Sequence, residues 1–172
     1  MHIKHTSSAQ RFINRTKLNQ KGFTLVELMI TLAVAFIIAA VAAPSFKNIV
    51  LSQRVKTASF DVNAALTFTR SEAVKRNASV TMEATDDAWE NGWSISADGT
   101  EIRVQEAYKG IAIVDSADLG LVTFSGNGRL SSAATDFTVS PADEVEGVAS
   151  RCISISLSGR ATSHSGGCED AE

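Results

Sequence analysis

The feature that most constrains this chain is an apolar run over residues 23–43 that contains one charged side chain, Glu27. At about 1.5 Å per helical residue, a helix of this length covers roughly 30 Å, the hydrocarbon thickness of a bilayer. The run therefore predicts one transmembrane helix. A carboxylate inside such a run is costly and usually marks a functional position or a paired charge.

The leader before this run, residues 1–22, carries basic side chains and no Asp or Glu. Because positive flanks stay in the cytoplasm, we expect the N-terminus inside and everything after the span outside. One interpretation is an ordinary signal peptide, cleaved after the small residues of 39–43. The position of Gly22, at the junction of basic and apolar sequence and shortly before Glu27, argues for a different kind of processing.

The charge balance restricts the partners of the exported part. The chain has 16 Lys and Arg against 19 Asp and Glu, and most of the acidic groups lie after Asn77. Removal of the basic leader makes the remaining chain more acidic still. Since neutralisation of phosphates by basic groups drives nonspecific binding to nucleic acid, this composition argues against nucleic acid as a partner.

Residues 44–79 are expected to continue the helix in amphipathic form, so that one helix runs from Phe23 to about Asn77. Apolar and small residues recur at spacings of three and four, which is typical of one helix face. The members of this face are Leu51, Val55, Ala58, Val62, Ala65, Leu66, Thr69 and Ala73. The opposite face is expected to carry Arg54, Lys56, Asp61, Arg70, Glu72, Lys75 and Arg76.

Residues 80–172 have the pattern of an antiparallel β-sheet domain. Short apolar or alternating runs are separated by turn signals such as Asp98-Gly99 and the glycines of 126–128. The expected strands are 80–84, 92–97, 101–107, 110–114, 121–125, 136–140 and 152–158. The fold class is therefore α+β, with a long N-terminal helix packed on an antiparallel β-sheet head.

The chain has two cysteines, Cys152 and Cys168. An even number in an exported domain favours a disulfide, because the compartment is oxidising. Two free thiols are the alternative. A bond between them would close a loop around the SGRATSHSGG segment, residues 158–167.

Several stretches carry a family resemblance. GFTLVELMITLAVAFIIAAVAAPSF, which begins at Gly22 and includes Phe23, Glu27 and Pro44, resembles the type IV prepilin signature. The rest of the chain resembles the GspH/FimT/FimU branch of minor pilins and pseudopilins, and with it the type IV pilin-like fold. The matching stretches are LTFTRSEAVKRNASVTM, ENGWSISAD, VTFSGNGRLSS and ISISLSGRATS.

The resemblance implies how the N-terminus is processed and used. A prepilin peptidase would cleave after Gly22 and methylate the new amine of Phe23, so residues 1–22 would be a cleaved cytoplasmic leader. The mature chain would enter a helical filament with its helix inward, where Glu27 pairs with the amine of Phe23 of its own or a neighbouring subunit. Pro44, near the end of the apolar run, belongs to the same assembly segment. The alternative for Glu27 is a helix-capping residue tolerated near the membrane interface.

The resemblance also implies a structural role without cofactors. The chain would be a non-enzymatic subunit at or near the tip of a type IV pilus or a type II secretion pseudopilus. Its partners would be the prepilin peptidase and other minor and major pilins or pseudopilins. Before assembly it would cross the inner membrane once, with its N-terminus in the cytoplasm and its head in the periplasm.

Two other functions are alternatives to this one. A DNA-uptake pilin would use Arg160 in a basic patch, but the second Arg of the DNA-binding members is replaced by Thr162. A membrane-anchored enzyme would need a catalytic set, and the sequence has no GxSxG, Walker, HExxH or CxxC motif. His164 and Cys168 alone do not make a zinc site. The acidic residues Asp86, Asp87 and Glu90 lack calcium-loop spacing and suggest a solvated turn.

Overall fold

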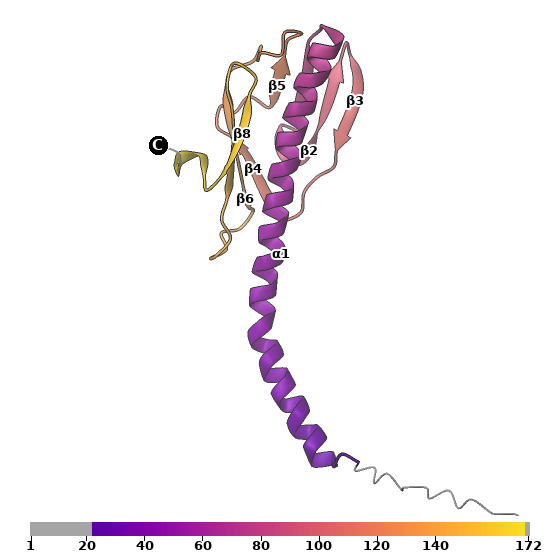
Figure 1. Cartoon of the computed structure of the whole chain (residues 1–172), viewed down its shortest axis with the longest axis vertical. Helices are drawn as coiled ribbons and strands as arrows, with labels where there is room; N and C mark the ends of the chain where they lie inside the picture. The colour runs from indigo at the N-terminus through magenta and orange to yellow at the C-terminus, as the bar shows by residue number, and fades with distance from the viewer. Residues whose placement is uncertain (1–21, 171–172) are drawn as a thin grey trace, which may run out of the picture. The chain divides into compact units, whose positions relative to one another are not determined.

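The computed structural model describes residues 22–170, without the side chains of residues 41–45 and of Asp170. Contacts divide the chain into two units, the first ending at Ala40 and the second beginning at Val41. Helix α1 (Leu25–Arg76) begins in the first unit and ends in the second, which holds all the strands (Figure 1). The strands are β1 (Val80–Thr85), β2 (Ala88–Ala97), β3 (Thr100–Gln105), β4 (Ile111–Asp115), β5 (Leu121–Phe124), β6 (Thr135–Pro141), β7 (Arg151–Ile155) and β8 (Ala161–Ser165), followed by a short 3₁₀ helix, η1 (Cys168–Asp170).

The predicted apolar face of α1 is the face that packs on the head. Its members from Val55 to Ala73 are almost fully inaccessible to solvent, and Leu51 packs against them at the N-terminal end of this face. Small residues such as Ala58 and Ala65 alternate with Val62 and Leu66 along this face. The helix can therefore approach the strands closely while still burying apolar surface, which is the main source of its stability in this setting.

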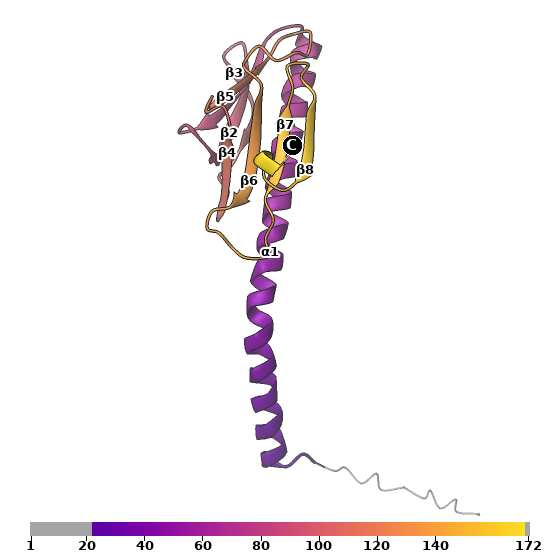
Figure 2. The same cartoon turned by 90° about the vertical axis from the view of Figure 1, so that its left-hand side faces the viewer.

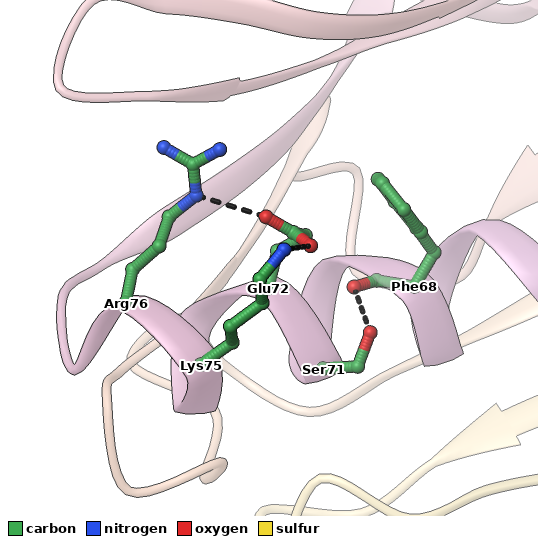
Figure 3. A network of polar contacts seen from close by, with 5 residues as sticks. All are labelled: Phe68, Ser71, Glu72, Lys75 and Arg76. Atoms are coloured by element: carbon green, nitrogen blue, oxygen red, sulfur yellow. Dashed lines mark hydrogen bonds and ion pairs between the residues drawn. The ribbon is translucent and has the colours of Figure 1, made fainter.

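One member of the expected charged face is not on the surface. Glu72 is only 8% exposed, so the prediction that it points outward is wrong. Arg76 Nε donates to Glu72 Oε2 at 2.9 Å and Lys75 Nζ donates to Oε1 at 3.1 Å (Figure 3). In the same turn Ser71 Oγ donates to the carbonyl oxygen of Phe68 at 2.8 Å. These two cations near the end of α1 compensate a carboxylate that the helix dipole disfavours there.

The hydrogen bonds from Arg76 and then Lys75 hold the pKa of Glu72 below its ordinary value. A carboxyl whose pKa is lower in the folded chain stabilises the fold above its unfolded pKa, and this contribution is lost as the pH falls through the folded pKa. We therefore expect wild type to lose more stability than Glu72→Gln between about pH 6 and about pH 3. Urea unfolding, followed by the fluorescence of the buried Trp89 and Trp93, measures the difference.

The control for this prediction is Glu83→Gln, because Glu83 is an exposed carboxylate on β1. This variant should follow wild type across the same pH range. A parallel loss of stability in wild type and Glu72→Gln would contradict a stabilising role for the carboxylate.

The strands form two four-stranded antiparallel sheets, ordered β3-β2-β1-β5 and β4-β6-β7-β8. In Figure 1, β3 lies on one side of α1 and β8 on the other; Figure 2 shows β7 and β8 beside the helix. The antiparallel head was predicted, and its division into two sheets was not. Strand patterns indicate which residues lie on one face, but they do not indicate which strands pair.

All seven predicted strands occur, and one was missed. Residues 161–165 form β8, which pairs with β7 along its whole length, so the expectation of a loop there is wrong. The strand predicted over 152–158 ends at Ile155, and Leu157 lies exposed in the turn that follows. The polar sequence of β8, ATSHS, has no apolar alternation, because this edge strand is mostly exposed.

Aromatic side chains join the two sheets to each other and to α1. The ring of Trp89 in β2 meets Phe137 in β6 edge to face, with centroids 5.0 Å apart. The ring centroids of Trp93 and Tyr108 lie 5.8 Å apart, and the Tyr108 hydroxyl donates to Asp61 Oδ2 at 2.9 Å. Burial, and then the bond to Asp61, raise the pKa of Tyr108. The hydroxyl therefore stays protonated and donates to the helix at neutral pH.

Two glycines form a second junction between the sheets, at the end of α1 where the helix stops. Gly128 follows β5 and Gly159 lies in the turn between β7 and β8, and both have left-handed backbones, with φ of 76° and 79°. Arg70 Nε donates to the carbonyl oxygen of Gly128 at 2.9 Å. A Cβ added at Gly159 would overlap that same oxygen. Gly159 is therefore required by backbone conformation and by close approach together.

Gly159→Ala should lower the free energy of unfolding by about 3 kcal/mol, from left-handed strain and from overpacking against Gly128. Gly99→Ala is the matched control, because Gly99 has a φ of 72° but open space around its Cβ position. It should cost about 1–2 kcal/mol, from backbone strain alone. Denaturant unfolding of both variants measures the difference, and equal losses would show that the contact with Gly128 is not tight.

Candidate processing and assembly site

The first turn of α1 is closed by a side-chain cap. Gly22 and Phe23 precede the helix, and Thr24 Oγ1 accepts a hydrogen bond from the backbone N–H of Glu27 at 3.2 Å. Thr24 and Glu27 have the spacing of a capping box, in which the carboxylate would also bond back to the amide of the capping residue. That return bond does not occur here within the described residues. The cap therefore uses the amide of Glu27 and leaves its carboxylate available.

The Glu27 side chain is exposed, and among the described residues it has no hydrogen-bond or ion-pair partner. Its surroundings in the first unit are apolar. The large apolar side chains there are each at least half exposed: Phe23, Leu25, Val26, Leu28, Met29, Ile30, Leu32, Val34, Phe36, Ile37 and Ile38. A contiguous apolar surface of this kind marks contact with lipid or with other proteins.

Within residues 22–170, no helix meets the length and hydropathy expected of a membrane span. The span predicted from the sequence ends in residues 41–43, whose side chains are outside the described part of the structure. Pro44 lies within α1, and its side chain is also among those not described. The span and the role of Pro44 therefore stay predictions.

The part of α1 in the second unit has a second apolar stripe, outside its buried face. Phe46, Ile49 and Phe60 are each about two-thirds exposed, and Gln53 and Thr57 continue the spacing between them. From the sequence, charged residues were expected on the exposed side of α1, and the stripe was not predicted. The signal was present as a three-and-four spacing from Phe46 to Phe60, out of phase with the core positions.

Cys152 and Cys168 are joined in a disulfide, which is the pairing expected from the sequence. Cys152 is buried in β7 and Cys168 begins η1, so the bond encloses the turn after β7 and all of β8. It ties the end of the chain to a buried strand, at a place where termini otherwise fray. His164 lies opposite Cys152 on β8 rather than in a loop, and its Nε2 is buried without a partner.

Arg160 is exposed in the turn between β7 and β8. Its carbonyl oxygen accepts from the N–H of Ser156 at 3.1 Å, and its side chain has no partner within the described residues. The adjacent Gly159 is held against Gly128, so the turn that presents Arg160 has a defined backbone. The guanidinium is thus available for contact with another molecule.

The fold explains the other residues considered as metal ligands, which are the acidic residues after β1 and the pair His164 and Cys168. Asp86 and Asp87 both have left-handed backbones and form the tight turn from β1 to β2. Cys168 is unavailable as a ligand beside His164, because its sulfur is in the disulfide. Across the described residues there is no group of three or more His, Cys, Asp or Glu side chains arranged to hold a metal ion.

The structure is similar to solved structures of a minor pilin and a minor pseudopilin. The chain is similar to two crystal structures of the type IV minor pilin FimU of Pseudomonas aeruginosa, with 26% identity and TM-scores of 0.56 and 0.58. These matches cover 63% and 65% of this chain and 91% and 89% of the FimU chains. The minor pseudopilin EpsH of Vibrio cholerae shares the fold at 11% identity and a TM-score of 0.51, over 65% of this chain and 97% of EpsH. The fold is therefore the α+β, pilin-like fold expected from the sequence.

The family follows from the sequence profile. The family described as Type II transport protein GspH matches residues 58–159, which is more than half of the chain, and the prokaryotic N-terminal methylation motif matches residues 17–43. The chain belongs to the GspH family of minor pilins and pseudopilins. The resemblance stated from the sequence is confirmed.

Proposed function

We propose that the chain is a structural subunit of a type IV pilus or type II secretion pseudopilus, placed at or near the filament tip. The observation that carries this proposal is the two-sided helix: one face of α1 is buried on the head, while Phe46, Ile49 and Phe60 lie outside that face and stay exposed. A second apolar surface on a helix whose first apolar face is already buried usually marks contact with another molecule. Neighbouring helices inside a filament are such a surface.

The N-terminal residues support the same role. We propose that the peptidase cleaves after Gly22 and methylates Phe23, as the methylation motif over residues 17–43 indicates. Before assembly, residues 23–43 would anchor the chain in the inner membrane, with the leader in the cytoplasm and the head in the periplasm. The 26% identity with FimU favours the pilus over the secretion system, since the likeness to EpsH is one of fold.

Glu27 is the residue proposed to direct assembly. Its carboxylate is not used by the helix cap, and the large side chains around it on α1 are apolar. An ionised carboxylate in such a setting is stabilised by an opposite charge, and the amine of Phe23 in the same or an adjacent subunit supplies one. The DNA-uptake alternative has only the exposed Arg160 in its favour, and the acidic head opposes it. We assign Arg160 to contact with another subunit.

Glu27→Ala tests this role in cells. Membrane insertion should be unaffected, because the apolar segment becomes more apolar. The amount of the variant in sheared, purified filaments should fall by at least about tenfold, since leaving the partner charge unpaired costs about 3–5 kcal/mol. Quantitative immunoblotting of membranes and filaments measures both quantities.

Glu83→Ala is the matched control, because it removes an exposed carboxylate from β1 and leaves α1 unchanged. It should enter filaments at the wild-type level. Normal incorporation of Glu27→Ala would count against the proposed pairing. Absence of the wild-type chain from all filament preparations would reject the proposed function itself.

Processing is tested by the intact mass of the chain recovered from membranes. The mass should correspond to Phe23–Glu172 plus one methyl group. In cells without the prepilin peptidase, the chain should retain residues 1–22. A mature N-terminus near Ala43 would instead show an ordinary signal peptide, and the filament proposal would fail with it.

A further inference from the structure

A small polar pocket lies on the head, between α1, the loop from β6 to β7, and the edge strand β8. Its volume is about 190 Å³. Ser52 and Lys56 line it from α1, Ser150 from the loop before β7, Arg151 from the start of β7, and Ser165 from the end of β8. Figure 2 shows the loop after β6 passing beside the helix before β7 begins.

Two basic residues line the pocket, and none of the described acidic residues does. Arg151 Nε is buried and has no hydrogen-bond partner, and neither Arg151 nor Lys56 forms an ion pair with another described residue. Both ion pairs recorded in the described part of the chain involve Glu72, at the other end of the helical segment. Because the head is strongly acidic, carboxylates are plentiful, and yet none of the described ones pairs with these two cations. A buried charged donor without a partner is costly, by more than a neutral one.

The walls of the pocket are held by bonds that do not involve its cations. Asn48 Nδ2 donates to the carbonyl oxygen of Glu146 at 3.1 Å, which fastens the β6–β7 loop to α1. The N–H of Gly166 donates to the carbonyl oxygen of Ser150 at 2.9 Å, which fastens the end of β8 to the start of β7. The pocket is therefore formed in advance, and an incoming group does not have to order it.

We propose that this pocket binds a single oxyanion, coordinated by Arg151 and Lys56 with serine hydroxyls as additional donors. Guanidinium and ammonium groups beside hydroxyls are the donors that carboxylate, sulfate and phosphate groups accept from. The volume is below the roughly 300 Å³ at which pockets for organic ligands begin, so one charged group fits and a larger ligand does not. The anion is either a free inorganic one or the carboxylate of an acidic side chain on an adjacent subunit, a source that rests on the proposed function.

Titration calorimetry on the full mature chain in detergent micelles tests the site. The probes are sodium sulfate and N-acetyl-aspartate amide, each titrated at constant ionic strength against chloride. Saturable binding of one equivalent is expected. Saturation by sulfate alone would identify an inorganic anion, and saturation by the aspartate derivative would identify an acidic side chain as the occupant; either result supports the site.

Lys56→Gln and Arg151→Gln should each weaken binding about tenfold, as expected for loss of one charge-assisted contact. Arg129→Gln is the matched control, because Arg129 is an exposed cation in the loop after β5, away from the pocket lining, and it should bind as wild type does. If Arg151→Gln does not fold, Lys56→Gln still decides, since Lys56 is an exposed residue of α1. No saturable binding of either probe, or equal weakening by Arg129→Gln and Lys56→Gln, would overturn the proposal. Neither result would bear on whether the chain enters filaments.

Discussion

Burial of one face of α1 is the interaction on which the rest of the head depends. The residues from Val55 to Ala73 supply this face, and both sheets contribute buried apolar residues to the same core. The small side chains of Ala58 and Ala65 let the strands come close, and the larger Leu66 fills the space that remains. Each sheet includes short strands. The polar edge strand β8 therefore depends on the helix beside it to stay in place.

The two sheets are tied to each other by two different kinds of junction. The first is apolar and aromatic: Trp89 against Phe137, with Tyr108 extending the cluster to Asp61 on the helix. The second is steric, where Gly159 approaches the carbonyl of Gly128. The two glycines belong to the GNGR and SGR stretches that carry the family resemblance. The resemblance of these two stretches to the family thus has a structural explanation: the backbone itself forms the contact between distant loops.

The same helix links the fold to assembly. Its buried face is used within the chain, and the second apolar stripe that includes Phe60 is left for other subunits. Stability and assembly therefore depend on different faces of one element. Substitutions on the outward stripe can alter incorporation into a filament while the head stays folded, because such positions make few contacts within the chain.

Sequence alone determined the features that depend on local pattern. Periodicity of three and four residues identified the buried face of α1, and strand and turn patterns identified seven of the eight strands, because each side chain's preference is expressed within its own segment. The basic-to-apolar junction at Gly22, with Glu27 beyond it, indicated a type IV prepilin, and four later stretches of the sequence indicated the GspH/FimT/FimU branch. Tertiary structure decided the division into two sheets, the pairing of the polar β8 with β7, and the burial of Glu72 against the head. It also decided that Lys56 and Arg151, far apart in the chain, share one pocket, because pairing and proximity depend on how distant segments meet, and no local pattern encodes that.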